Sequence, residues 1–346
     1  MIIYLMLIFF IIFLYFLIPK NKKAYCIICT ILLILVAGLR HQELGNSDNI
    51  ALYIPAFQKI QYLTFRQVFL AFKDTDPFFY LLMKLFTVFS KNLNLYIFFL
   101  SLFTIIPYGY LIYKKSKNTC ISFLIYIALN FYFLSFITYR HSLASAILVL
   151  AYIAFGENKI KKFVILTLIA SLFHSSAIVF LLLLFIRKIK FNYKWIIYIS
   201  LSLIVSIFFS SVFKELIFKF VTNSHYLLYK NINNTINLNA FYINLMFIIF
   251  CLVFNKKINE DDKINLNLIC FGTCISSMTI IIDVFYRIAL FFVMPIIIEV
   301  PTAISKIAKA KDRMMVSIIL SLLLIIYTFI STLTNLNLID YKFFWN

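Results

Sequence analysis

Residues 163–186 read FVILTLIASLFHSSAIVFLLLLFI, an apolar run with His174 and two serines at its centre. Both flanks of the run are basic, NKIKK at 158–162 and RKIKFNYK at 187–194. A polar group in hydrocarbon costs free energy unless a partner satisfies it, so a histidine inside such a run is a candidate functional group. The run and its flanks bear on both the class of fold and the place of His174.

Apolar runs of this kind repeat along the whole chain. Of its 346 residues, 64% are hydrophobic and only 13% are charged, and the charges lie in short clusters between the runs. The pattern predicts an all-α, polytopic integral membrane protein in which residues 1–346 form a single transmembrane domain. The net charge of +19 lies mostly in the short loops, where it reports topology, so we expect no nucleic-acid partner.

The basic clusters predict the orientation of the passes. Short loops rich in lysine and arginine lie on the cytoplasmic side of a membrane. Six loops of this chain qualify, at 19–23, 114–118, 158–162, 187–194, 255–263 and 305–313. Because the run 163–186 has such a loop at each end, it must begin and end on the cytoplasmic side.

A single span cannot begin and end on one side, so we expect a hairpin over 163–186. Each leg has about 12 residues, or about 18 Å of helix at 1.5 Å per residue. That is shorter than a hydrocarbon core about 30 Å thick. The tip near His174 is therefore predicted to lie below the outer surface, in protein or in a water-filled cavity.

The remaining runs predict about 12 transmembrane passes, with both termini outside. Two long segments then fall on the outer side, at about 40–76 and 213–239. The run 77–90 is too short to span and carries Lys84, so we expect an interfacial or re-entrant helix there.

This topology brings polar residues from separate segments to the outer ends of helices. They are Arg40, His41, Glu43, Asp48, Arg140, His141, His174, Asp283 and Arg287. The arginine fork binds phosphate bidentately, so several arginines at this depth suit a lipid-linked phosphate or diphosphate. Ordinary interpretations stay open: an arginine snorkels to headgroups, Asp283 and Arg287 form a helical ion pair, or His174 caps a helix.

Motifs around these residues resemble the EpsG-like branch of the Wzy-type bacterial polysaccharide polymerases. They follow the family's order and are Arg40 with Gly45-x-x-Asp48-x4-Tyr53-x3-Phe57, Asp76-Pro77-Phe78-Phe79-Tyr80, Ser135-Phe136-x-x-Tyr139-Arg140-x3-Ala144, Ala170-Ser171-Leu172-Phe173-His174-Ser175-Ser176-Ala177 and Tyr286-Arg287-x3-Phe291-Phe292. The FH-x-SA piece is the most specific of them. Three positions depart from the family's pattern: His141 replaces a glutamine, Asn49 a tyrosine and Asp76 a glutamate.

The resemblance implies glycosyl transfer at the outer face of the bacterial cytoplasmic membrane. The donor would be a glycan chain on undecaprenyl diphosphate, and the acceptor the terminal sugar of a new lipid-linked repeat unit. The product would be an O-antigen, a capsule or an exopolysaccharide, and undecaprenyl diphosphate would leave. By resemblance, a chain-length regulator and a flippase are further partners. No nucleotide sugar is needed, and we expect neither a cofactor nor a metal.

Each predicted site residue has a role in this expected reaction. Arg140 and Arg287, together with Arg40, would stabilise the charge that develops on the leaving diphosphate. His174 or Asp48 would take the proton of the acceptor hydroxyl. Supporting roles fall to Tyr53, Tyr139, His141, Ser175, Asp283 and Tyr286.

Two alternative functions remain. A membrane O-acyltransferase of surface glycans also uses a histidine within apolar helices, but its loss would leave the length of the glycan unchanged. A lipid-linked oligosaccharide transporter or flippase is expected to show repeated halves with broken helices, and this sequence has no clear internal repeat.

Overall fold

The computed structural model describes residues 2–18, 21–44, 49–220, 238–255, 258–334, 338 and 340–345. Asp48 and most of the predicted outer segment 213–239 lie outside these ranges. The described elements are helices, together with one isolated β-bridge between Arg40 and Phe343, and this confirms the predicted all-α class.

The chain divides into two compact units, which are described separately. The first combines Met1–Ile178 with Ile307–Asn346, and the second is Val179–Lys306. The single transmembrane domain over 1–346 stays a prediction.

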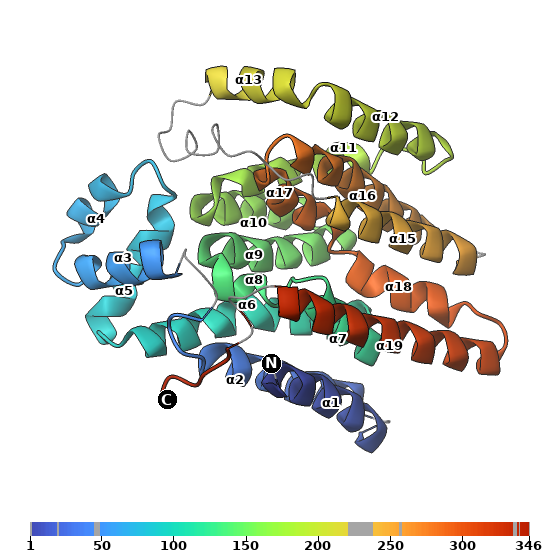
Figure 1. The fold of residues 1–346 in the computed structure, drawn as a ribbon, viewed down its shortest axis with the longest axis horizontal. Coiled ribbons are helices and arrows are strands. Elements are labelled where there is room, and N and C mark those ends of the chain that lie inside the picture. The colour runs from blue at the N-terminus through green and yellow to red at the C-terminus, as the bar shows by residue number, and fades with distance from the viewer. Residues whose placement is uncertain are drawn as a thin grey trace. The chain divides into compact units, whose positions relative to one another are not determined.

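The helices of the first unit lie in successive layers (Figure 1). From one side to the other they are α1 (Ile2–Leu17), α2 (Lys22–Gly38), α6 (Leu93–Lys115), α9 (Tyr139–Gly156) and α10 (Ile160–Phe173). Each packs on the next, and α19 (Ala310–Thr334) packs on α7 (Thr119–Ala128). Asparagine side chains cap the first turns of α2, α6 and α7, which is why these helices begin directly after the polar loops.

Two glycines allow the close approach of α2 and α6. A Cβ atom on Gly38 would lie 2.5 Å from the ring of Phe98, and one on Gly109 would overlap Thr30. Small residues at a helix crossing let backbones approach closely, and in a membrane this packing replaces the hydrophobic effect as the force between helices. Because α6 also packs on α9, this contact connects α2 with the helix pair α6 and α9.

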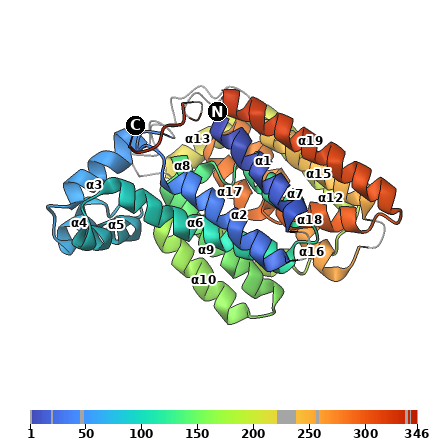
Figure 2. The same ribbon diagram turned by 90° about the horizontal axis from the view of Figure 1, so that it is seen from below.

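The predicted outer segment 40–76 contains short helices in its described part. They are α3 (Ile54–Ile60) and α4 (Phe65–Ala71), followed by α5 (Pro77–Phe89), and they lie at one end of the layers (Figure 2). Their buried side chains form a core with α6 and α9 that includes Tyr53, Phe57, Phe79, Tyr96 and Tyr139. The helix expected over 77–90 is confirmed as α5, whereas its interfacial or re-entrant placement stays a prediction.

The C-terminal residues return to the end of α2. The His41 N–H donates to the Lys342 carbonyl at 2.8 Å, and the Phe344 N–H donates to the Leu39 carbonyl at 3.0 Å. The Tyr341 hydroxyl donates to the Val36 carbonyl at 2.8 Å. These bonds connect the C-terminal residues with the segment that carries Arg40.

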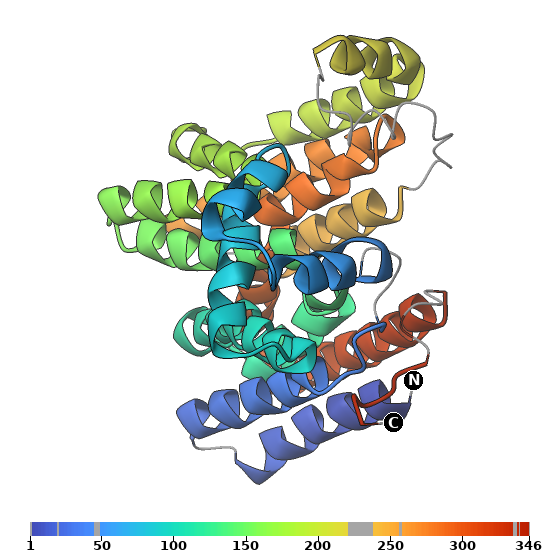
Figure 3. The ribbon, with the colours of Figure 1, turned by 90° about the vertical axis from the view of Figure 1, so that its left-hand side faces the viewer.

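The second unit is built around α16 (Glu260–Ser277). It packs against α11 (Leu183–Ile186), α12 (Lys194–Phe208), α15 (Asn239–Phe254), α17 (Val284–Val293) and α18 (Ile296–Ser305). Figure 3 shows these helices in colours from yellow-green to orange, with α13 (Ser210–Phe220) following α12. Asp262 and Glu299 are buried here and bond to Asn255, whose side-chain oxygen also accepts from Lys306 at 2.8 Å.

Helix length and composition make this an integral membrane protein. Within the described ranges, three helices are long and apolar enough to cross a membrane, namely α6, α9 and α19. The number rises to five if α12 with α13, bent by 80°, and α17 with α18, bent by 41°, each count as one span. Further apolar helices, such as α1 and α15, have only 10–17 residues. The 12 passes therefore stay a prediction.

Candidate functional site

The Asp76 carboxylate joins two of the predicted site residues. Its Oδ2 accepts a hydrogen bond from Nη1 of Arg140 at 3.1 Å and lies 3.2 Å from Nδ1 of His174. Its Oδ1 accepts from the backbone N–H of Ser175 at 3.0 Å. The three side chains are between 7% and 14% exposed. Asp76, Arg140 and His174 thus form one largely buried polar group, the Asp76 cluster.

A tight turn before α5 aims the carboxylate at this cluster. Asp76 has φ 59° and ψ 64°, a left-handed conformation that asparagine and aspartate adopt more readily than other non-glycine residues. Pro77 follows, and a proline disfavours right-handed helical backbone in the residue before it. The Asp76 side chain makes no capping bond to α5, although aspartate is a favoured cap. Its oxygens are engaged instead by α9 and by the end of α10.

Arg140 lies in the first turn of α9, and hydrogen bonds of its guanidinium group hold its side chain in place. Nη1 also donates to the Thr75 carbonyl at 3.0 Å, and the guanidinium carbon lies 6.0 Å from the centre of the Tyr80 ring. The Nε–H is buried without a hydrogen-bond partner. Buried donors are nearly always paired, so this unpaired donor is a candidate to bind an acceptor such as a phosphate oxygen.

His174 lies where α10 ends. Its backbone is extended, with φ −154° and ψ 110°, and a 3-10 helix begins at Ser175. The chain therefore breaks at the predicted tip, while the reversal into a second leg stays a prediction because a boundary between units follows Ile178. The ring of His174 packs edge-on against that of His141, with centroids 5.6 Å apart. With Nδ1 at Asp76, Nε2 is the ring nitrogen left for a substrate.

The surroundings keep the Asp76 carboxyl ionised. Burial works to raise its pKa, but the hydrogen bond from His174 and the charge of Arg140 outweigh burial. Together with the Ser175 N–H, they hold the pKa of Asp76 below its ordinary value of 3.8. The carboxylate is therefore an acceptor only, which suits three donors around two oxygens.

Arg40 lies in a neighbouring buried group rather than in the Asp76 cluster. It is 1% exposed, and its guanidinium donates to the carbonyls of Ala37 and Ser135 and, at 3.0 Å, to the Tyr139 hydroxyl. The Tyr139 ring stacks on Tyr53 with centroids 4.5 Å apart, and Tyr53 in turn interacts with Arg140. The predicted supporting residues Tyr53 and Tyr139 thus connect the two arginines.

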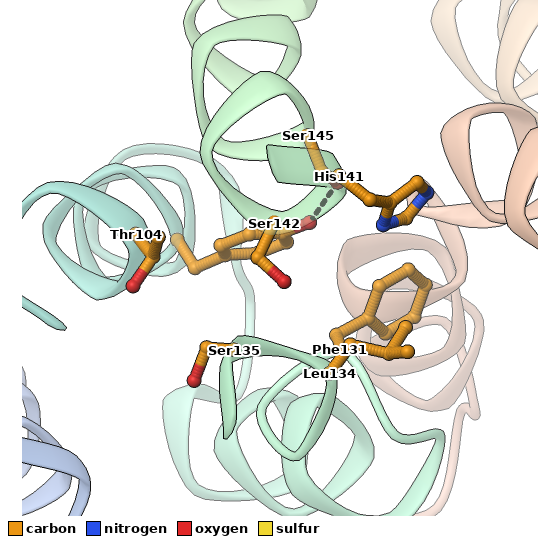
Figure 4. A pocket seen from close by; sticks show the side chains of 8 residues that line it. Thr104, Phe131, Leu134, Ser135, His141, Ser142 and Ser145 are labelled. Atoms are coloured by element: carbon orange, nitrogen blue, oxygen red, sulfur yellow. Dashed lines mark hydrogen bonds between the residues drawn. The ribbon is translucent and has the colours of Figure 1, made fainter. Parts of the chain in front are cut away.

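His141 also lines a small pocket (Figure 4). It is lined by Thr104, Tyr108, Phe131, Leu134, Ser135, His141, Ser142 and Ser145. Tyr108 and Ser145 share a hydrogen bond of 2.7 Å, whereas the Ser142 hydroxyl is buried without a partner. The free space of about 10 Å³ is near the lower limit for holding one water molecule, so the pocket is too small for a sugar.

The other predicted site residues belong to the second unit or lie outside the described residues. Asp283 is exposed and precedes α17, and Tyr286 and Arg287 follow on that helix within the second unit. Their roles stay predictions, and Asp48 lies outside the described residues. Among the described residues, no group of three or more His, Cys, Asp or Glu side chains is arranged to hold a metal ion.

Asp76 is the residue that sequence reasoning missed. It stands in a motif of the resemblance, but it was not among the expected site residues. The available signal was its position: Asp76 is an acidic residue directly before Pro77, at the end of a predicted outer segment and at the start of an apolar run. Its partners are 64 and 98 residues away in the sequence, so no local pattern reveals them.

Fold and site together define an integral membrane protein with a carboxylate, an arginine and a histidine gathered at helix ends. A family model described as the EpsG family matches residues 23–343, and the chain belongs to this family. It is thus a membrane protein of polysaccharide biosynthesis, and the expected resemblance is confirmed. No curated protein and no solved structure matched the chain.

Proposed function

We propose that this protein is a polysaccharide polymerase that joins undecaprenyl-diphosphate-linked repeat units at the outer face of the cytoplasmic membrane. The observation that carries the proposal is the Asp76 cluster, in which Arg140 offers a fork for phosphate and His174 offers an imidazole for a hydroxyl proton. Membership of the EpsG family supports the class of product.

The proposed reaction exchanges one glycosidic bond for another. The oxygen of an acceptor sugar hydroxyl attacks the anomeric carbon of the donor chain, and a carbon–oxygen bond forms. The bond between that anomeric carbon and the diphosphate oxygen breaks, and its electron pair leaves with undecaprenyl diphosphate. The hydroxyl proton passes to Nε2 of His174, which then releases it to the leaving diphosphate or to water.

Arg140 supplies the positive charge on which the leaving group depends. Negative charge develops on the diphosphate as the bond breaks, and a fixed donor stabilises this charge without reorganisation. The buried, unpaired Nε–H of Arg140 is such a donor. We assign Arg287 to the same diphosphate from its place in the family's motif. Arg40 holds Tyr139, and through Tyr53 it supports Arg140.

Deletion of the gene tests the proposal against its alternatives. A polymerase mutant accumulates single lipid-linked repeat units and makes no long chains. A mutant lacking an O-acyltransferase makes chains of normal length without the acyl group. A mutant lacking a flippase keeps the repeat units on the cytoplasmic side, where a periplasmic glycosidase cannot reach them. Either of the last two results would overturn the proposed function.

Single substitutions then test the site. His174→Ala, Arg140→Ala and Arg287→Ala are expressed in the deletion strain, and the amount of each protein in the membrane is measured beside the glycan ladder. We expect long chains to be lost while the protein accumulates. Normal chains in all three strains would exclude this site.

A further inference from the structure

We propose that Asp76 is a positioning residue that sets the tautomer of His174, so that Nε2 of the imidazole faces the acceptor hydroxyl without a proton. This inference rests on the proposed polymerase function and deepens it. It gives a role to a residue that touches neither sugar nor diphosphate in the proposed reaction.

The hydrogen bonds around the carboxylate determine where the proton of the ring lies. An ionised carboxylate only accepts hydrogen bonds. Oδ2 of Asp76 lies 3.2 Å from Nδ1 of His174, so Nδ1 must carry the proton in this contact. In a neutral imidazole the other nitrogen then has a free lone pair. Asp76 thus selects the tautomer that a base at Nε2 requires.

The carboxylate is itself held in one orientation. Oδ1 accepts the Ser175 N–H at 3.0 Å, directly after the histidine, and Oδ2 accepts Nη1 of Arg140 at 3.1 Å. One carboxylate therefore sets the distance between His174, the proposed base, and Arg140, which is proposed to bind the diphosphate. Its side chain is 7% exposed, so bulk water has little access to replace these contacts.

The backbone supports the same interpretation. A non-glycine residue with φ 59° carries a conformational cost, and such residues persist where the surrounding structure over-determines them. The Asp76 side chain does not cap its own helix, although it stands at the cap position of α5. The strained turn and the lost cap both serve to bring the carboxylate to α9 and to the end of α10.

Kinetics in lipid nanodiscs tests the role of the carboxylate. The substrate is the lipid-linked repeat unit purified from cells that lack this gene. We expect Asp76→Asn to lower kcat by about 10²–10⁴, since an amide NH₂ facing Nδ1 favours the wrong tautomer. The loss should fall on kcat more than on KM. Asp76→Glu, which keeps the carboxylate, should recover at least about a tenth of the wild-type kcat. Asp74→Asn, exposed and two residues earlier, is the matched control and should leave kcat within about twofold.

A double-mutant comparison separates positioning from an independent role. If Asp76 acts through His174, then Asp76→Asn should lower kcat by less than about threefold when His174 is already alanine. An additional loss as large as in the wild-type background would overturn the proposal. A kcat within about threefold of wild type for Asp76→Asn, with normal membrane levels, would do the same.

A spectroscopic measurement reads the tautomer of His174 in the wild-type protein itself. The chain has four histidines, so the imidazole signals of ¹⁵N-histidine-labelled protein are few, and His174→Gln identifies the signal of interest. We expect that signal to show a proton on Nδ1 and none on Nε2. A proton on Nε2 would overturn the proposal. If the wild type fails to polymerise the purified repeat unit, the proposed function fails, while the tautomer of His174 is still measured.

Discussion

Replacement of Arg140 by lysine separates the shape of this cation from its charge. In the native chain one nitrogen of the guanidinium donates both to the Thr75 carbonyl at 3.0 Å and to Asp76 at 3.1 Å. A second nitrogen, Nε, is buried and unpaired. A lysine keeps the positive charge, but its ammonium is a single point that cannot occupy both positions. Arg140→Lys therefore removes either the bond to Asp76 or the donor for the diphosphate.

The two losses have different magnitudes. Loss of one charge-assisted hydrogen bond lowers the free energy of unfolding by about 1.5–3 kcal/mol, and both side chains are buried enough for this value to apply. Loss of one positioned donor at the leaving group lowers kcat by about 10²–10³, equivalent to about 2.7–4 kcal/mol. We expect the lysine to retain the bond to Asp76, because that carboxylate is ionised. The protein should then accumulate while kcat falls.

The assay measures the amount of protein and the polymerisation rate in the same membranes. The amount of tagged protein is quantified by immunoblot, and the initial rate is measured with the purified lipid-linked repeat unit. Arg313→Lys, on the exposed start of α19, is the matched control and should leave both values unchanged. If Arg140→Lys polymerises within about threefold of the wild-type rate at a normal membrane level, the reasoning about the fork is wrong.

Three further predictions concern stability. Gly109→Leu places a side chain in the α2–α6 contact and should lower the free energy of unfolding by about 1–3 kcal/mol, seen as a lower Tm in detergent. Tyr139→Phe keeps the stack on Tyr53 but removes an acceptor of buried Arg40, so a similar fall of about 1–3 kcal/mol is expected, and an unchanged Tm would contradict it. Because the pKa of Asp76 is lowered in the fold, its stabilising effect is complete above 3.8 and is lost as the pH falls through the folded value. The Tm of the wild type should therefore fall more steeply at acidic pH than that of Asp76→Asn.

Much of the helical pattern could be predicted because its cause is local. The sequence predicts helices over the apolar runs 240–254 and 314–333, and the structure has them as Asn239–Phe254 and Ala310–Thr334, since an apolar run bounded by polar residues is a strong local signal for a helix. The breaks were harder to predict. The apolar run 119–138 predicts one continuous pass, but the helix α7 ends at Ala128 and the chain turns at Asn130, where φ is 63°. A single asparagine is a weak signal for such a turn.

The short helices of the predicted outer segment 40–76 were not predicted, for a different reason. α3 and α4 are seven residues each, too short to be stable alone, and they are supported by packing on a core that includes Phe57 and Val68. Such helices depend on neighbours that are distant in sequence. A polar segment of this kind therefore reads as a loop until its packing is known.

The candidate site was predicted in part. Arg140 and His174 could be predicted as site residues because a charged or polar side chain is unusual within or beside an apolar run. The order of residue types along the chain is enough to show this. The burial of Arg40 among carbonyls and aromatic rings does not follow from that signal. The part played by Asp76 does not follow either, because an acidic residue in an outer segment is unremarkable by its type.

The sequence by itself determined that this is an all-α membrane protein and that an arginine and a histidine lie near the ends of its helices. These properties depend on hydrophobic length and on charge near each run, both of which are read residue by residue. Only the tertiary structure decided that Asp76 lies between Arg140 and His174. That contact depends on how α5, α9 and α10 pack, and a hydrogen bond is satisfied only at a distance of about 3 Å, which no pattern along the chain encodes.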